Sequence, residues 1–254
     1  MTDTPPVDIR FEIRLNADSP AWTREEYDRI YSTRGIRQLD SFYKWILDQI
    51  RPRPGSRLLD VACGEGTLSR FAEERYHVQA HGSDLSVAAL QIAASEASGP
   101  FCVGSGEGLP YASASFDYVT CIGSLEHFLD VRAGVREMAR VLRPDGVACI
   151  FVPNTYSLLG NILKAWRTGM STVDFQPMQR YAARGEWELI FRECGLESVR
   201  VFKWDREPPY SLTDLAWYVE RPRELFRLVV GPLIPTNLAN HLGFLLRHSA
   251  GGSQ

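Results

Sequence analysis

Acidic residues and glycines follow short apolar runs in the N-terminal half of the chain. The stretch RLLDVACGEGTLSRFAEE, residues 57–74, carries Asp60, Gly64 and Gly66 between an apolar run and a helical pattern, and Asp84 follows a second run at 78–82. Glycine lets a ligand approach the backbone closely, and a carboxylate can accept hydrogen bonds from hydroxyls or pair with a cation. The pattern predicts a ligand site at a backbone turn flanked by carboxylates.

The turn differs from the common nucleotide-binding turns. A dinucleotide fingerprint needs G-x-G-x-x-G, and Ala62, Gly64 and Thr67 stand at its three places. A P-loop would need Gly-Lys-Ser/Thr, which does not follow. Asp60 and Glu65 also put negative charge where a pyrophosphate would meet a helix N-terminus. These acids favour a ligand that carries an ammonium or sulfonium cation.

Strands that alternate with helices would position these residues. Apolar runs predict strands at 58–62, 78–82, 101–103, 118–122 and 147–152, then at 198–204 and 241–247. Alternation over about 100 residues predicts parallel pairing. We therefore expect the α/β class, with a doubly wound, mostly parallel Rossmann-like sheet, N-terminal helices and a helical cap formed by insertions. Ligands of such sheets bind at the carboxyl ends of the strands.

The breaks in this alternation predict the domain organisation. Residues 1–50 form an N-terminal helical cap segment, irregular up to about residue 20, and residues 51–154 form the ligand-binding core. Residues 155–182 form a lid insertion. Residues 183–254 complete the core, with a second insertion at about 205–239.

Composition narrows the functional class. The 254 residues are 44% hydrophobic and 23% charged, which is typical of a packed core, and the net charge of −3 gives no broad attraction to nucleic acid. The five cysteines show no zinc spacing, and no acidic metal cluster stands out, so no metal is expected. The sequence has no run of about 18 apolar residues, so it predicts no membrane span, and the N-terminus is too polar for a signal peptide. We expect a cytoplasmic protein.

Four ordered motifs resemble the core of the class I S-adenosylmethionine-dependent methyltransferases, in their small-molecule group. They are LLDVACGEG, GSDLS, GSGEGLPYASASFDYVTCIGSLEHFLD and EMARVLRPDGVACIFVPN, within residues 57–154. The resemblance implies S-adenosyl-L-methionine as cofactor, S-adenosyl-L-homocysteine as product and a small-molecule acceptor. Two residues depart from the family pattern. Ala62 replaces the usual first glycine of the loop, and Ser105 replaces the usual acid at the adenine.

The resemblance also implies roles for single residues. Asp60 and the backbone of the glycine turn would hold the methionine portion, and Asp84 would accept both ribose hydroxyls. The implied cofactor-binding residues are Asp60, Ala62, Gly64, Gly66, Asp84, Leu85, Gly106, Glu107, Ile122 and Gly123. From the residues alone, Asp60 could instead cap the following helix, and Asp84 could be an ordinary acid at a helix N-terminus.

His127 is the candidate catalytic residue. The motif places it near the transferred methyl group, and imidazole is a suitable base at neutral pH. A base is needed only when the acceptor must lose a proton. Alternatively, His127 and Glu126 shape the loop without moving protons.

Aromatic residues outside the core predict the acceptor. Those expected to contact it are Tyr27, Tyr31, Tyr156, Trp166 and Tyr181. They indicate an acceptor with apolar or ring character, such as a natural-product intermediate, quinone or lipid. Alternatively, the aromatic side chains of the insertions form a small core of their own. The apolar stretch 225–246 could lie on a membrane or on a second copy in a homodimer.

Two other functions stay open. A nicotinamide-dependent oxidoreductase is disfavoured by Ala62 and Thr67. A non-catalytic S-adenosylmethionine-binding protein would need the same glycine turn and the same acids, so the sequence does not exclude it.

Overall fold

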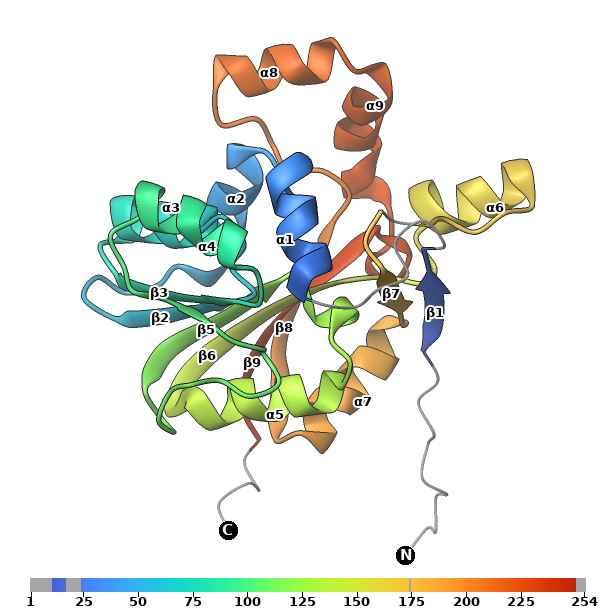
Figure 1. Cartoon of the computed structure of the whole chain (residues 1–254). Coiled ribbons are helices and arrows are strands. Elements are labelled where there is room, and N and C mark those ends of the chain that lie inside the picture. The colour runs from blue at the N-terminus through green and yellow to red at the C-terminus, as the bar shows by residue number, and fades with distance from the viewer. Residues whose placement is uncertain (1–10, 17–23, 174, 250–254) are drawn as a thin grey trace, which may run out of the picture.

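Seven strands form the central sheet of the protein. The computed structural model describes residues 11–16, 24–173 and 175–249. The strand order is β4-β3-β2-β5-β6-β9-β8, and only β9 runs against its neighbours (Figure 1). The strands are β2 (Arg57–Val61), β3 (Gln79–Asp84), β4 (Phe101–Val103), β5 (Phe116–Ile122), β6 (Leu142–Pro153), β8 (Leu196–Trp204) and β9 (His241–His248). The predicted α/β class with a mostly parallel, Rossmann-like sheet is confirmed.

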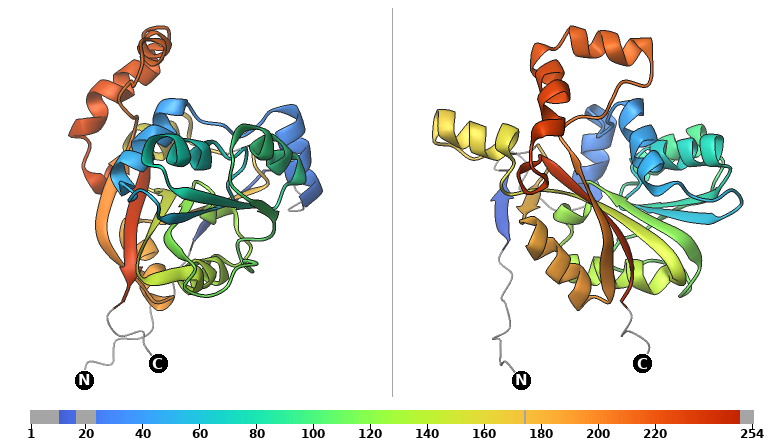
Figure 2. Two further views of the ribbon diagram at one scale, coloured as in Figure 1. Left: turned by 90° about the vertical axis from the view of Figure 1, so that its left-hand side faces the viewer. Right: turned by 180° about the vertical axis from the view of Figure 1, so that it is seen from behind.

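Helices cover both faces of this sheet (Figures 1 and 2). One face carries α2 (Asp40–Ile50), α3 (Thr67–Tyr76) and α4 (Val87–Glu96), and the other carries α5 (Val131–Val141) and α7 (Arg184–Glu193). Each face has its own buried apolar cluster, one around Ile46 and Phe71 and one around Met138 and Trp187. Strands buried on both faces need the nearly continuous apolar runs seen in the sequence.

The helix α5 shows how the sequence sets these elements. Asp130 caps its N-terminus, because its carboxylate accepts from the backbone N–H of Ala133 at 2.9 Å. Val131, Val135 and Met138 recur at helical spacing and are all buried against the sheet.

A second, two-stranded sheet was not predicted. Strand β1 (Glu12–Leu15) pairs antiparallel with β7 (Met178–Tyr181), whereas the sequence predicts an irregular segment up to about residue 20. The reason is that β1 is four residues long and mostly exposed, and its partner is more than 160 residues away. Only that distant partner makes it a strand. Helix α1 (Arg24–Thr33) follows.

Two segments interrupt the core at the carboxyl ends of the strands. The π-helical turn η2 (Leu158–Ile162) and α6 (Leu163–Thr168) lie between β6 and β7. Helices α8 (Leu212–Val219) and α9 (Pro222–Val230), then the turns η3 (Gly231–Leu233) and η4 (Thr236–Leu238), lie between β8 and β9. Figures 1 and 2 show α6 and α8 extending beyond the body of the fold. Within the described ranges, no helix combines the length and apolar character needed to cross a bilayer.

Candidate functional site

Two adjoining cavities lie at the carboxyl ends of the central strands. The larger cavity has a volume of about 440 Å³ and the smaller one about 80 Å³. They share the lining residues Tyr31, Ile36, Ala62, Gly123, Ser124, His127 and Gln176. The position agrees with the general location of ligand sites in open α/β sheets.

The glycine turn after β2 is packed between two helices. Ala62, Gly64 and Gly66 all have positive φ, of 56°, 54° and 72°. A Cβ at Gly64 would lie 2.6 Å from the Tyr31 hydroxyl, and one at Gly66 would lie 2.8 Å from the Cβ of Ala93. Gly64 and Gly66 are therefore fixed by both backbone conformation and close packing. Gly66 is also the N-cap of α3 and gives it no side-chain cap.

Asp84 joins this turn to the next helix. One carboxylate oxygen accepts from the backbone N–H of Gly64 and the other from that of Ser86, each at 2.8 Å. The N-cap of α4 is Ser86, which accepts from Ala89. Asp84 is 6% exposed and lines the smaller cavity together with Leu85, Gly106 and Glu107. The structure thus brings together the residues expected at the ribose and adenine.

Burial raises the pKa of both acids at the site. The pKa of Asp84 is raised to about 6, against the backbone hydrogen bonds that lower it. Asp60 is 4% exposed, and burial raises its pKa to about 7, with a smaller contribution from the charge of Asp84. Asp60 caps no helix; it accepts from the Thr120 hydroxyl at 2.6 Å and lines the larger cavity with Gly64 and Ile122. Two buried carboxyls of raised pKa fit a ligand that brings a positive charge.

His127 lies at the boundary of the two cavities and lines both. It belongs to the 3-10 turn η1 (Leu125–His127), and its Nδ1 lies 2.5 Å from the carbonyl oxygen of Met178 in β7. A carbonyl only accepts, so Nδ1 carries the hydrogen, and whenever the ring is neutral its lone pair is on Nε2. Arg180 holds the same loop by donating to the carbonyls of Phe128 and Leu129. The side chain is therefore fixed in the tautomer that a base requires.

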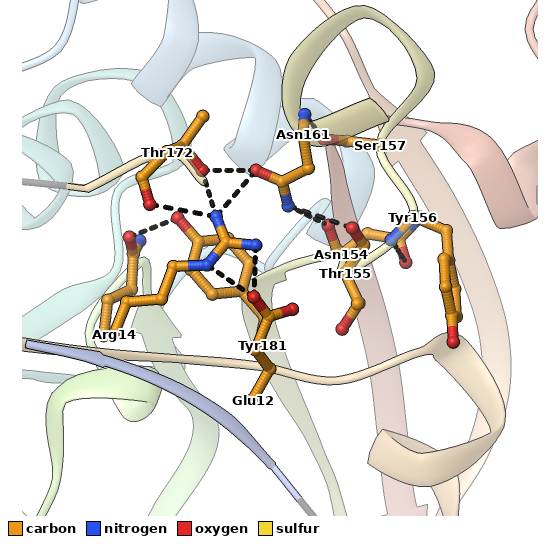
Figure 3. A network of polar contacts seen from close by, with 10 residues as sticks. Glu12, Arg14, Asn154, Thr155, Tyr156, Ser157, Asn161, Thr172 and Tyr181 are labelled. Atoms are coloured by element: carbon orange, nitrogen blue, oxygen red, sulfur yellow. Dashed lines mark hydrogen bonds and ion pairs between the residues drawn. The ribbon is translucent and has the colours of Figure 1, made fainter. Parts of the chain in front are cut away.

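The predicted acceptor residues separate into two groups. Tyr27 lines the smaller cavity, Tyr181 the larger one, and Tyr31 both. Tyr156 and Trp166 lie outside the lining of both cavities, with exposed fractions of 56% and 80%. Tyr156 turns away from the polar residues around it in Figure 3, and Trp166 belongs to the projecting helix α6.

Helix α1, which carries Tyr27 and Tyr31, is attached to the core by Asp28. Its carboxylate accepts from the Ser86 hydroxyl at 2.6 Å and from the backbone N–H of Ala88 at 3.0 Å. The N-terminus of α4 therefore holds α1 beside Asp84.

The far wall of the larger cavity was not predicted from the sequence. It contains an aromatic group in which His241 stacks on Phe151, with ring centroids 5.1 Å apart and planes 3° apart, and meets the edge of Trp204 at 5.2 Å. Burial lowers the pKa of His241 to about 3, so its ring is neutral. Polar lining residues add to this wall: Asn161, Thr172, Gln179, Arg227 and Asn240. They come from separate segments, so no single stretch of sequence reveals them.

Arg14 of β1 organises part of this wall (Figure 3). Its Nη1 donates to the Asn161 side-chain oxygen and to the Thr172 carbonyl, each at 3.0 Å, and its guanidinium lies 4.0 Å from the Tyr181 ring centre. Glu12 pairs with it at 2.7 Å. The N-terminal strand thus fixes three residues that line the larger cavity.

Comparison with known proteins gives the family context. Residues 59–150 match a family model described as a methyltransferase domain. The chain is 29% identical over 165 residues to the uncharacterized methyltransferase YcgJ of Bacillus subtilis, covering 63% of this chain and 64% of that protein. It is 36% identical over 124 residues to a demethylmenaquinone methyltransferase of Corynebacterium urealyticum, covering 48% of each.

A solved structure supports the fold. An S-adenosylmethionine-dependent methyltransferase from Mesorhizobium loti superposes with a TM-score of 0.60 at 17% identity, covering 81% of this chain and 98% of that one. The chain spans about half to two thirds of the length of the curated relatives it matches. The match to these relatives is thus limited to part of each chain.

Proposed function

Since the chain carries the domain of the class I S-adenosylmethionine-dependent methyltransferases, we propose that it transfers the methyl group of S-adenosyl-L-methionine to a small-molecule acceptor. The observation that carries this proposal is the meeting of two cavities at one glycine turn. The smaller cavity has the acid and backbone suited to an adenosine. The larger one has a buried acid and an aromatic wall.

The chain's own residues fit the cofactor. Both Asp84 oxygens accept backbone hydrogen bonds, and the carboxylate has further lone pairs that could accept from ribose hydroxyls. Asp60 would pair with the ammonium of the methionine portion beside the backbone of Gly64, which lines the same cavity, whereas Gly66 lines neither cavity. Gly106 and Glu107 would flank the adenine, and Gly123, which lines both cavities, would border the pocket after β5.

The bound cofactor supplies an activated methyl group on a sulfonium. The chain must then align the acceptor with this methyl and exclude water, and alignment alone contributes about 7–11 kcal/mol to such reactions. We propose that Nε2 of His127 accepts the proton that an acceptor hydroxyl, amine or acidic carbon loses as it bonds to the methyl. With that proton held on His127, the methylated acceptor would be neutral.

The far wall supports an acceptor with apolar or ring character. Phe151, His241 and Trp204 offer ring faces and edges, and Tyr31 and Tyr181 would contact the acceptor from the other side. The demethylmenaquinone methyltransferase relative is consistent with a quinone-type ring, and a lipid or natural-product intermediate shares this character. Tyr156 and Trp166 have no part in the proposal, because they lie outside the lining.

The test is incubation of the pure protein with labelled methyl donor and fractionated small-molecule extract, followed by mass identification of the product. A demethylated naphthoquinone is the first single compound to try. We expect a labelled product that His127→Asn reduces strongly. Binding of S-adenosyl-L-homocysteine without product from any fraction would instead support a non-catalytic binding protein. Thermal stabilisation by a nicotinamide cofactor alone would support an oxidoreductase.

A further inference from the structure

Exposed apolar side chains gather on the two segments that project from the core. Segment 156–173 has seven large hydrophobic side chains that are exposed, and segment 212–233 has six. Together they are thirteen of the eighteen such side chains among the described residues. We call the exposed side chains of these two segments the apolar surface. Concentrations of this kind mark interaction sites on proteins.

The helices of the apolar surface have apolar outer faces. Leu212, Leu215 and Val219 of α8 recur at helical spacing and are 86%, 45% and 62% exposed. The inner face of α8 carries Tyr218, which is buried and donates from its hydroxyl to the Glu207 carbonyl at 2.7 Å. A helix on a protein surface ordinarily turns polar residues outward. The outer face of α8 is therefore built for an apolar contact.

The next helix repeats this arrangement. Phe226 and Val229 of α9 and Leu233 of η3 follow one another at three and four residues, and they are 55%, 66% and 82% exposed. In the other segment, Trp166 of α6 is 80% exposed and Met170 is 64% exposed.

Hydrogen bonds hold the two segments together beside the larger cavity. Arg227 of α9 donates to the Leu159 carbonyl in η2 at 2.8 Å, and Lys203 of β8 donates to the Gly231 and Pro232 carbonyls at 3.1 and 2.9 Å. Arg227 and Val173 both line the larger cavity. The apolar surface is thus continuous with the wall of the cavity assigned to the acceptor.

The charge of the apolar surface is opposite in sign to that of the whole chain. Segments 156–173 and 212–233 contain five basic residues and three acidic ones, whereas the chain has a net charge of −3. Glu224 pairs with Arg206, and Glu220 with Arg221. Within the part of the chain that the structure describes, Lys164, Arg167 and Arg223 enter no ion pair. These cations stand among exposed Trp, Phe and Leu side chains, the composition of helices that lie in a membrane interface.

We propose that the apolar surface docks on an anionic phospholipid bilayer, with α6, α8 and α9 partly inserted at the level of the head groups. The cations favour this occupant over a second copy of the chain, which would bring the same positive charges together. Docking would place the larger cavity next to the bilayer, so that an apolar acceptor could enter from the lipid phase. This route of entry for the acceptor rests on the proposed function; the docking does not.

The experiment is co-sedimentation of the full chain with vesicles of phosphatidylcholine alone and with about 30% phosphatidylglycerol. The test variants are Trp166→Ser, Phe226→Ser and Val229→Ser, and the charge variants are Arg167→Glu and Arg223→Glu. Val199→Ser is the matched apolar control, because Val199 of β8 is 56% exposed away from the apolar surface. Arg192→Glu on α7 is the matched charge control, because Arg192 is exposed and enters no ion pair with the described residues.

We expect binding to the anionic vesicles that falls about tenfold or more in the test and charge variants and not in the controls. Binding should also weaken when salt rises from about 0.1 M to about 0.5 M. No binding of the unchanged chain, or equal loss in the controls, overturns the proposal. The proposal is also overturned if the chain binds no vesicles and sedimentation velocity shows a dimer that Phe226→Ser dissociates. Calorimetry with S-adenosyl-L-homocysteine in solution, without vesicles, shows separately whether the proposed function fails.

Discussion

Replacing the buried acid of the larger cavity should stabilise the free protein and weaken its cofactor binding. Asp60 is 4% exposed and accepts a hydrogen bond from the Thr120 hydroxyl. Burial raises its pKa to about 7. Asparagine has nearly the same shape, can still accept from Thr120 and cannot ionise. Asp60→Asn therefore removes a group whose ionised form destabilises the folded protein.

The sign and size of the effect follow from the two pKa values. An aspartate in an unfolded chain has a pKa of about 3.9, so the fold binds this proton more tightly than the unfolded chain does. The contribution of Asp60 to stability is complete below about pH 4 and is lost as pH rises through about 7. A difference of about three pH units corresponds to about 4 kcal/mol at pH 8. At pH 8 we expect Asp60→Asn to raise the free energy of unfolding by about 2–4 kcal/mol, which raises the Tm by about 5–10 °C. At pH 4 we expect little change in either quantity.

Differential scanning calorimetry of both proteins from pH 4 to pH 8 measures this difference, with Asp145→Asn, at an exposed position, as control. Titration with S-adenosyl-L-homocysteine should show the opposite trend, an affinity lower by about 10- to 100-fold, because the ligand ammonium loses its partner. A variant that is less stable than the unchanged protein at pH 8, or that gains equally at every pH, refutes the reasoning. So does an unchanged affinity.

Three further changes test single parts of the site. Asp84→Ala should lower the affinity for S-adenosyl-L-homocysteine by about 10²–10⁴, since two hydrogen bonds from the ribose to a charged group are lost. The far-UV circular dichroism spectrum should be unchanged. An affinity within threefold of the original excludes the ribose assignment. His127→Asn should lower kcat by about 10²–10⁴ at unchanged cofactor affinity, and equal losses in both would indicate a purely structural role. Asp28→Ala should lower the stability by about 1 kcal/mol and speed proteolysis within α1, because two bonds to the start of α4 are lost; unaltered cleavage would show that α1 is held by other contacts.

The central sheet could be predicted from the sequence because each strand and helix carries its own signals within a few residues. Each buried strand is an apolar run that ends in a glycine or polar residue, and helices such as α5 carry their caps and apolar stripes within about a dozen residues. Strand β1 lacked such a signal. Its partner β7 lies far along the chain, and both strands are four residues long.

The residues of the site also fall into those that local sequence indicates and those that only the fold brings together. The glycine turn and Asp84 stand next to the strands that position them, so the sequence indicates both, and the structure joins them through the hydrogen bond from the Gly64 N–H to the Asp84 carboxylate. The far wall of the larger cavity joins side chains from β6, β8 and β9, and His241 lies there only because β9 pairs between β6 and β8. Trp166 shows the converse, since its aromatic character indicated a lining residue and its helix turns it to the solvent.

Isothermal titration of the pure protein with S-adenosyl-L-methionine and S-adenosyl-L-homocysteine tests the central claim most directly. We expect one-to-one binding of both compounds, greatly weakened for both in Asp84→Ala. Absence of binding heat for either compound over a range of temperatures, with no rise in Tm at saturating concentrations, would contradict it.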